Sequence, residues 1–249
     1  MPLARKWFGR DFWYTAKMLR RLSVGFALAL VLVVLVAVGT YFLMNSRTYQ
    51  VAGRLVDRVD TADKVVALTL DDGPSDNAPE VLKVLADAGI TATFYLNGRD
   101  LAARPDTGRA IAAAGHEIGN HTYNHRRMVF VSDETVRAEI EDTDAEIAKT
   151  GYRGPITFRP PYGKKLWSLP EYLADHDRTT VMWDVEPDSG KVATTDEVVR
   201  ETVAEVRPGS IILLHIMSNP DSLAAIPRIV AELRADGYTF LPVSQLLTR

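Results

Sequence analysis

From Val65 onward the sequence repeats one pattern: a short apolar run, a polar turn, an amphipathic stretch with helical spacing, and a glycine before the next apolar run. These glycines stand where a helix would end in a left-handed cap, and their positions are Gly89, Gly115, Gly151 and Gly237. A capping box is predicted at residues 194–197, where Thr is followed three positions later by Glu. Strands that alternate with such helices predict parallel β/α units, either as a barrel or as an open doubly wound sheet.

Seven apolar runs are candidate strands, at residues 65–70, 91–96, 117–120, 156–159, 179–183, 210–215 and 238–242. A short edge strand is also expected within residues 49–56. The chain has 249 residues, of which 47% are hydrophobic, and this is enough for one full-sized core or two small ones. No linker or low-complexity stretch interrupts the sequence after residue 64.

Residues 24–44 form an uncharged, mostly apolar stretch of 21 residues. As a helix it would be roughly 31 Å long, which matches the hydrocarbon core of a bilayer. A cleaved signal peptide would have an apolar region of about 7 to 15 residues that ends in small residues. This stretch ends instead in Tyr41, Phe42, Leu43 and Met44. An uncleaved membrane anchor is therefore the preferred interpretation over a cleaved signal.

Charge is distributed unevenly around the apolar stretch. Residues 1–22 contain six basic residues and one acidic residue, although the whole chain has a formal charge of −3, and the next basic residue after the stretch is Arg47. This asymmetry places the N-terminus inside. We therefore expect a cytoplasmic basic segment (1–22), a transmembrane signal anchor (23–44), a stalk (45–63) and a main folded domain (64–249). The protein would cross the cytoplasmic membrane once, with its main domain on the extracytoplasmic side.

Chemically useful side chains follow five of the candidate strands. In parallel β/α folds, ligands bind at the carboxyl ends of the strands, where loops from different units converge. The groups at these ends are Asp71 and Asp72, His121 and His125, Arg159, the run from Trp183 to Asp188, and His215. Singly, each has an ordinary explanation: Asp-Gly is a turn signal, an apolar strand often holds a core histidine, and Pro160-Pro161 is a stiff turn. Their joint placement is what predicts a site.

The residue types favour metal-assisted hydrolysis. The chain has no cysteine, so any metal must be held by His, Asp or Glu. The spacing of His121 and His125 would place both imidazoles on one side of a helical turn. One carboxylate with two imidazoles leaves an open coordination position, as in catalytic zinc sites. A second carboxylate could then take a proton from water, a histidine could protonate the leaving group, and an arginine could orient the base.

Three motifs in this order resemble those of the polysaccharide deacetylases of carbohydrate esterase family 4, which share the chitooligosaccharide deacetylase homology domain. The first motif, T-F-D-D-G, corresponds to residues 69–73 with Leu70 in place of Phe. The second, H-[ST]-x-x-H, corresponds to residues 121–125, and the third, R-x-P-Y-G, to residues 159–163. The resemblance covers roughly residues 64 to 247. It implies an α/β fold, a distorted (β/α)7 barrel, here preceded by one N-terminal transmembrane helix.

The resemblance also implies a role for individual residues. Asp71 would be the general base, tethered by Arg159, and the backbone N–H of Tyr162 would help to stabilise the oxyanion. His215 would be the general acid and Asp188 the carboxylate that tunes it. The substrate pocket would involve Leu213, Trp183 and Pro161, and the metal ligands would be Asp72, His121 and His125. The expected ion is Zn²⁺, with Co²⁺ or another divalent ion as alternatives.

The fourth motif departs from the family pattern. The family often has an Asp-Trp pair a few residues after a strand-ending Trp, whereas Asp188 here is followed by Ser189. The residue after His215 is Ile216, where the family commonly has Asp. These differences concern the wall of the acetyl pocket and the environment of the acid.

The preferred hypothesis is hydrolysis of N-acetyl groups from an N-acetylhexosamine-containing cell-envelope polysaccharide, with peptidoglycan the leading substrate. Exopolysaccharide or chitooligosaccharide deacetylation and an O-acetyl xylan-type esterase are alternatives within the class. Two hypotheses from other classes are a non-catalytic glycan-binding protein on the same fold and a membrane assembly factor whose soluble domain binds partners. The expected partners are the glycan and the membrane, through residues 23–44, and the sequence implies no nucleic-acid or protein partner.

Overall fold

The computed structural model describes residues 8–189, 193–216 and 219–249. Two basic residues of the expected cytoplasmic segment, Arg5 and Lys6, lie outside the described residues. The chain divides into two compact units, Met1–Leu43 and Met44–Arg249.

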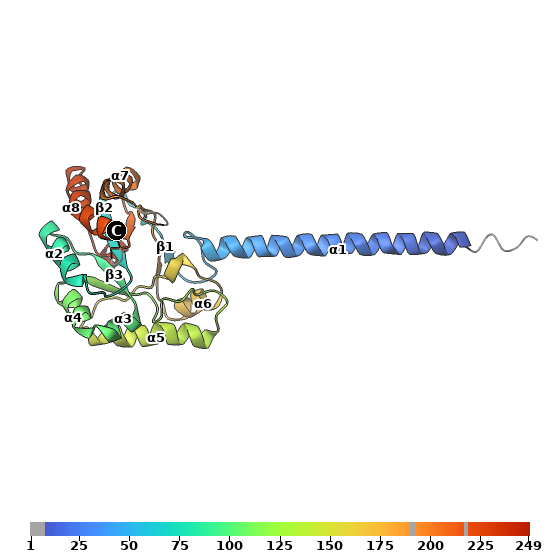
Figure 1. Cartoon of the computed structure of the whole chain (residues 1–249), viewed down its shortest axis with the longest axis horizontal. Helices are drawn as coiled ribbons and strands as arrows, with labels where there is room; N and C mark the ends of the chain where they lie inside the picture. The colour runs from blue at the N-terminus through green and yellow to red at the C-terminus, as the bar shows by residue number, and fades with distance from the viewer. Residues whose placement is uncertain (1–7, 190–192, 217–218) are drawn as a thin grey trace, which may run out of the picture. The chain divides into compact units, whose positions relative to one another are not determined.

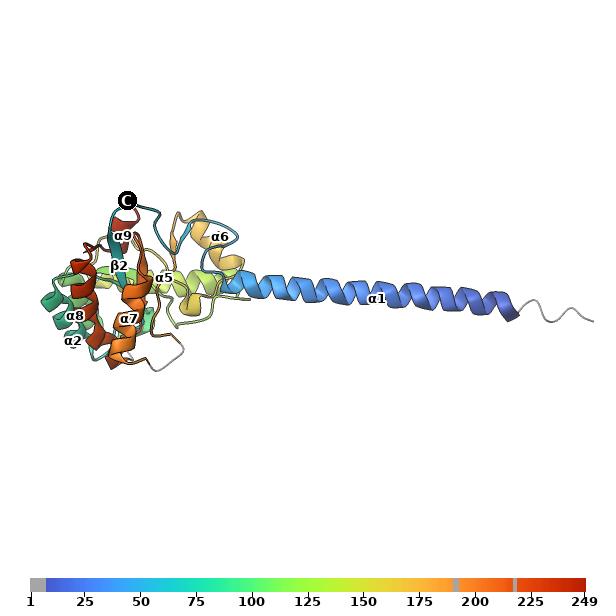
Figure 2. The same cartoon turned by 90° about the horizontal axis from the view of Figure 1, so that it is seen from above.

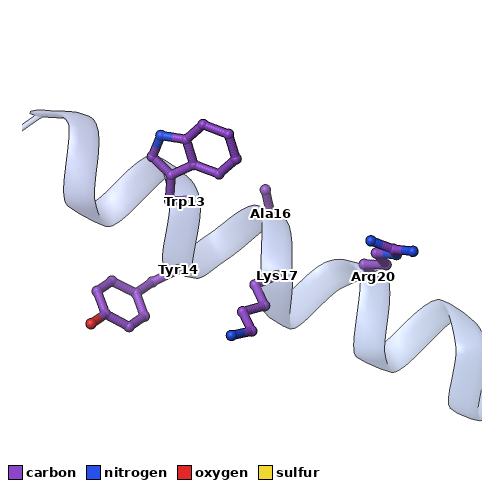
Figure 3. A pocket seen from close by; sticks show the side chains of 5 residues that line it. All are labelled: Trp13, Tyr14, Ala16, Lys17 and Arg20. Atoms are coloured by element: carbon purple, nitrogen blue, oxygen red, sulfur yellow. The ribbon is translucent and has the colours of Figure 1, made fainter.

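The first unit is built by the long helix α1 (Phe8–Asn45), which ends two residues inside the second unit (Figure 1). By length and composition alone, its portion Trp13–Asn45 could cross a membrane, and a signal sequence would pass the same test. Near its amino end the helix carries Trp13, Tyr14, Lys17 and Arg20 around Ala16, as Figure 3 shows. Aromatic and basic side chains of this kind are typical of a spanning helix where it meets the membrane surface.

The second unit contains the strands and the shorter helices, which Figure 1 shows with the helices outside the strands. The strands are β1 (Leu55–Val56), β2 (Val65–Asp71), β3 (Thr93–Leu96), β4 (Glu117–Asn120), β5 (Thr180–Val181), β6 (Ile211–Leu214) and β7 (Thr239–Phe240). The helices are α2 (Ala78–Ala88), α3 (Gly98–Ala103), α4 (Pro105–Ala113), α5 (Asp133–Lys149), α6 (Ser168–Asp175), α7 (Thr195–Glu205), α8 (Pro220–Ala235) and α9 (Val243–Leu246).

Parallel pairings join the strands into a closed, distorted barrel. β2 pairs with β6 on one edge and β3 on the other, and β3 pairs with β4. Single bridges then link Asn120 to Phe158 and Phe158 to Thr180 of β5. The chain continues from β5 to Val185, whose bridge to Ile212 returns to β6 and completes the circuit. The barrel alternative is therefore confirmed over the open sheet.

One expected strand is almost absent. Residues 156–159 contribute only the bridges at Phe158, so the prediction of a full strand there was wrong. Proline explains the loss, because it has no backbone N–H to donate to a ladder, and Pro155 and Pro160 bracket this segment. The expected edge strand within residues 49–56 is confirmed as β1, which pairs with β5. Residues 45–63, expected as a stalk, accordingly lie within the second compact unit.

The two faces of β2 explain how the fold positions the site. All seven of its residues are buried, because one face meets helices and the other faces the barrel interior. Leu68 and Leu70 belong to the cluster that includes the buried faces of α2 and α8, whereas Ala67 packs with Tyr95 and Leu213. The outer layer includes the neighbouring helices α7 and α8 (Figure 2). Since side chains alternate along a strand, Thr69 and Asp71 share the interior face with Ala67.

The predicted helix ends are also found. Gly89 caps α2 with a φ of 63°, and Gly115, Gly151 and Gly237 are likewise left-handed. The capping box at the start of α7 is present in both directions, between Thr194 and Glu197.

Candidate active site

The buried pair of Asp71 and Arg159 lies at the carboxyl end of β2. Arg159 Nη1 donates to Asp71 Oδ1 over 2.7 Å, and the arginine is 0% and the aspartate 3% exposed. Arg159 follows Phe158, whose bridges hold this part of the chain beside β4 and β5. The carboxylate is therefore held in one orientation and is not free to swing into solvent.

Every part of the Arg159 guanidinium is held. Nη1 also donates to the hydroxyl of Thr69 (2.8 Å), Nε donates to the carbonyl of Val181 (3.1 Å), and Nη2 donates to the carbonyl of Met182 (3.1 Å). The guanidinium carbon lies 4.2 Å from the ring centroid of Tyr95. This combination of fork geometry and ring stacking is specific to arginine.

Asp72, His121 and His125 form a cluster beside this pair, with their ligand atoms all within 4.8 Å of one another. His125 Nε2 is 3.2 Å, and His121 Nε2 3.9 Å, from Asp72 Oδ1. Asp72 and His125 have left-handed φ values of 74° and 54°. Residues other than glycine rarely adopt this conformation, and when they do they are often found at functional sites.

The tautomer of His121 fits a metal ligand. Its Nδ1–H donates to the backbone carbonyl of Arg159 over 2.8 Å, which leaves the lone pair of Nε2 directed at the carboxylates. Burial lowers the pKa of His121 to about 3, so the imidazole is neutral at physiological pH. Two imidazole nitrogens and one carboxylate oxygen are a donor set that suits Zn²⁺ and related divalent ions.

The loop that carries both histidines is not the helical turn that their spacing suggested. Thr122 has a φ of 66°, and its backbone N–H donates to the side chain of Asn120 over 2.9 Å. Glu139 of α5 accepts hydrogen bonds from the backbone and side-chain nitrogens of Asn124 at 2.8 and 3.0 Å. The two rings nevertheless converge, with centroids 5.1 Å apart. Hydrogen bonds accepted by two side chains outside the motif, Asn120 and Glu139, therefore hold the loop in place of a helical turn.

His215 and Asp188 form a second coupled pair. His215 Nδ1 donates to Asp188 Oδ1 (3.0 Å), while the His215 backbone N–H (2.8 Å) and the Ser222 hydroxyl (2.6 Å) donate to Oδ2. Burial alone would raise the pKa of Asp188, but these hydrogen bonds hold it below its usual value. Burial alone would lower the pKa of His215, but the bond to Asp188 and the charge of Asp71 raise it to about 9.

These groups meet in a cleft of about 330 Å³. The expected residues that line it are Asp71, Asp72, His121, His125, Tyr162, Trp183, Leu213 and His215. Tyr162 is left-handed (φ 58°) and 56% exposed, and its ring lies 4.7 Å from that of His125. Pro161 is buried in a short 3₁₀ turn (Pro161–Gly163), where its neighbours Tyr162 and Gly163 face the cleft. Arg159 and Asp188 lie behind the cleft wall, each holding a residue that lines it.

Four further residues line the cleft: Asn45, Arg47, Glu186 and Ser189. Glu186 stands in the acidic run after β5, where its charge was a visible signal, and it accepts from Trp183 Nε1 over 2.7 Å. Asn45 and Arg47 lie well before the first motif, and no local pattern distinguishes them. Ser222 and Glu139 were not predicted as residues of the site. Glu139 did carry a signal, because a carboxylate on the buried face of a helix such as α5 is unusual.

The protein is thus a β/α barrel in which one Asp and two His lie beside a buried carboxylate. This arrangement is typical of hydrolases. The family model for polysaccharide deacetylase matches residues 58–181. A peptidoglycan-N-acetylglucosamine deacetylase of Bacillus cereus is 33% identical over 200 residues, which are 78% of this chain and 93% of that protein. The chain therefore belongs to the polysaccharide deacetylase family, carbohydrate esterase family 4.

Two other relatives show the range of the family. A chitooligosaccharide deacetylase of Sinorhizobium fredii is 36% identical over 208 residues, which cover 77% of this chain and 96% of that protein. The crystal structure of a family 4 pseudoenzyme from Bacillus anthracis is 26% identical, covers 77% of this chain and 68% of that one, and has a TM-score of 0.71. The family therefore includes proteins described as enzymes and one described as a pseudoenzyme. Activity thus depends on which residues occupy the site.

Proposed function

We propose that the protein is a metal-dependent deacetylase that hydrolyses N-acetyl groups on an N-acetylhexosamine polymer of the cell envelope. The observation that carries this proposal is that three sets of groups meet at one cleft. A cluster suited to a metal ion, Asp72 with His121 and His125, stands beside the buried Asp71–Arg159 pair. The separate His215–Asp188 pair reaches the same cleft.

The residues can divide the chemistry of amide hydrolysis between them. A divalent ion held by Asp72, His121 and His125 would polarise the acetyl carbonyl and acidify a water molecule. Asp71, fixed by Arg159, takes a proton from the attacking water. His215, protonated and held by Asp188, gives a proton to the sugar nitrogen as its bond to the acetyl carbon breaks. The products are acetate and the free amino sugar, so water supplies the added oxygen and hydrogens.

Leu213 and Trp183 would form the apolar part of the acetyl site. Both line the cleft and are nearly buried, at 1% and 5% exposure. Trp183, two residues after β5, supplies an aromatic wall for this site, although Ser189 stands after Asp188 where the family often has Trp. The Tyr162 backbone N–H remains our proposed donor to the oxyanion.

Peptidoglycan is the leading substrate in this proposal. Peptidoglycan deacetylation is the activity named for the Bacillus cereus relative. An anchor formed by residues 23–44 would hold the domain outside the cytoplasmic membrane, where this polymer lies. We propose the N-terminus inside, since Lys17 and Arg20 lie on the amino side of the apolar stretch. The chain has no cysteine, so the single variants Ala4→Cys and Asp60→Cys test this orientation by thiol labelling of whole cells. A reagent that does not cross the membrane should label Asp60→Cys and not Ala4→Cys.

A glycan-binding protein without activity is the second candidate, because a family 4 pseudoenzyme shares the fold. Acetate release separates the two candidates. The full chain, in detergent and loaded with Zn²⁺ or Co²⁺, is incubated with N-acetylated peptidoglycan and with chitooligosaccharides. Release that is lost with Asp71→Asn and with a chelator supports the deacetylase. Glycan binding with retained metal and no release favours the second candidate.

A further inference from the structure

The first residues of the second compact unit, directly after Leu43, form part of the cleft wall. We call residues 44–47 the entry segment. Two of its residues, Asn45 and Arg47, line the cleft. The lysines that follow the third motif hold it in place: Lys165 N–H donates to the Met44 carbonyl over 3.3 Å, Lys164 Nζ bonds the Asn45 side chain, and Lys165 Nζ bonds the Ser46 carbonyl. The entry segment is therefore an ordered part of the site.

Arg47 contacts Glu186 and Trp183, and its side chain is partly exposed. Its Nη2 pairs with Glu186 Oε2 over 2.7 Å, and its guanidinium carbon lies 4.8 Å from the ring centroid of Trp183. Trp183 Nε1 donates to the same Glu186 oxygen over 2.7 Å. The side chain of Glu186 is only 8% exposed, whereas that of Arg47 is 48% exposed. The arginine is thus positioned by buried groups, and about half of its side chain stays exposed where it lines the cleft.

Arg47, which already pairs with Glu186, can bind a second anion. Asp71 is paired with Arg159, and Asp72 belongs to the candidate metal cluster. Among the residues that the structure describes as lining the cleft, Arg47 carries the one permanent positive charge. A guanidinium has five N–H donors in a fixed fork, and its pairing with Glu186 uses Nη2. Arginine is well suited to carboxylate recognition in this geometry.

We propose that Arg47 binds a carboxylate of the substrate, carried by a sugar next to the one that is deacetylated. This inference rests on the proposed deacetylase function and deepens it by naming the substrate class, an acidic N-acetylated glycan. Glu186 and Trp183 position the guanidinium, and the entry segment acts as a determinant of specificity. Neutral glycans use the same catalytic groups without this contact.

The test compares two forms of one substrate. Peptide-free glycan strands whose lactyl groups carry free carboxylates are assayed beside the same strands with these carboxylates converted to primary amides. With the full chain, kcat/KM is expected to be higher for the carboxylated strands. Arg47→Gln should reduce the ratio of the two kcat/KM values roughly 10- to 100-fold, the usual range for loss of a charge-assisted hydrogen bond. Arg47→Lys, which keeps the charge without the fork, should give an intermediate ratio.

The matched control is Arg54→Gln, which removes the same charge from a residue nearby in the sequence that is exposed and donates to the Leu247 carbonyl. This variant should keep the wild-type ratio. A ratio unchanged by Arg47→Gln would overturn the inference, and acetate release by the same preparations would show that the deacetylase function still stands. No acetate release from either strand by the wild-type protein would instead overturn the proposed function.

Arg47 could influence an acidic substrate indirectly, by neutralising Glu186. The double variant Arg47→Gln with Glu186→Gln separates direct from indirect action, because the amide oxygen introduced at position 186 can still accept from Trp183. Under direct recognition the double variant keeps the low ratio of Arg47→Gln. Recovery of the wild-type ratio in the double variant would contradict direct binding by Arg47.

Discussion

Arg159 and Asp71 are joined by an ion pair of 2.7 Å in which neither side chain is more than 5% exposed. The same arginine accepts, through its backbone carbonyl, the Nδ1–H of His121. One residue therefore orients both the proposed general base and a proposed metal ligand. This double role links the two halves of the site and makes the residue sensitive to any substitution.

Substitution of Arg159 by Met keeps much of the volume but leaves the Asp71 carboxylate buried without a partner. Breaking a buried pair in this way costs about 3–5 kcal/mol, so we expect a clear decrease in the free energy of unfolding. Chemical denaturation monitored by circular dichroism measures it. The double variant Arg159→Met with Asp71→Leu removes both charges and should recover part of the loss. An unchanged stability in the single variant would contradict the buried-pair description.

Asp71→Asn removes the proposed base while retaining its shape and its contact with Arg159. Loss of general base catalysis is expected to lower kcat by about 10²- to 10⁴-fold, with little change in metal affinity because the carboxylate of Asp72 remains. Steady-state acetate release and metal titration calorimetry measure the two effects. A variant that lost metal binding in step with activity would reassign Asp71 as a ligand.

Asp72→Ala and His125→Ala each remove one donor from the candidate metal cluster. We expect both variants to bind metal more weakly than the wild-type protein. A chelator should abolish the activity of the wild-type protein, and excess Zn²⁺ should restore activity better in the wild-type protein than in the variants. Elemental analysis after dialysis measures the bound metal. As a control, Asp76→Ala removes a nearby carboxylate that pairs with Arg104 and is not part of the cluster. Equal metal content in all the proteins would refute the assignment of the cluster.

Asp188→Asn tests the coupling to His215. A general acid must be protonated, so activity falls as the pH rises through its pKa, which Asp188 helps to raise to about 9. Loss of that carboxylate lowers the pKa of His215, and the alkaline limb of the pH–rate profile should move to lower pH. Ser222→Ala, which removes one hydrogen bond but no charge, should move it much less. An alkaline limb at the same pH in Asp188→Asn would exclude this coupling.

Gly119→Ala is expected to disturb the site from behind. A Cβ at this position would clash with Tyr95 Cε1, and the Tyr95 ring packs under the Arg159 guanidinium. Overpacking of this kind typically costs about 1–3 kcal/mol, and displacement of Tyr95 should also lower kcat. Thermal unfolding and acetate release measure both. The matched variant Gly115→Ala, at a helix end with no atom within 4 Å of its Cβ, should leave kcat unchanged while its left-handed φ lowers stability.

Local patterns in the sequence were sufficient to predict several parts of the structure. Buried strands such as β2 show as apolar runs because both of their faces are covered, and glycine marks a left-handed helix end because it lacks a Cβ. The motif residues were identified in the same way, since the carboxyl ends of parallel strands lie at one end of the fold. These patterns predicted the parallel β/α units and the strand-end position of Asp71, whereas the barrel and the grouping of Asp72 with His121 and His125 were predicted from the resemblance to carbohydrate esterase family 4.

Other features depended on contacts between residues far apart in the chain, which leave no local signal. The prolines around residues 156–159 reduced an expected strand to the bridges at Phe158. Hydrogen bonds that the side chains of Asn120 and Glu139 accept replaced the expected helical turn between the histidines. The sequence determined the strands, the helix ends and the chemical groups, because each depends on the residue itself and its near neighbours. Only the tertiary structure decided that Arg47 stands in the cleft against Trp183, because that position depends on ion pairing and packing between segments that are distant in the sequence.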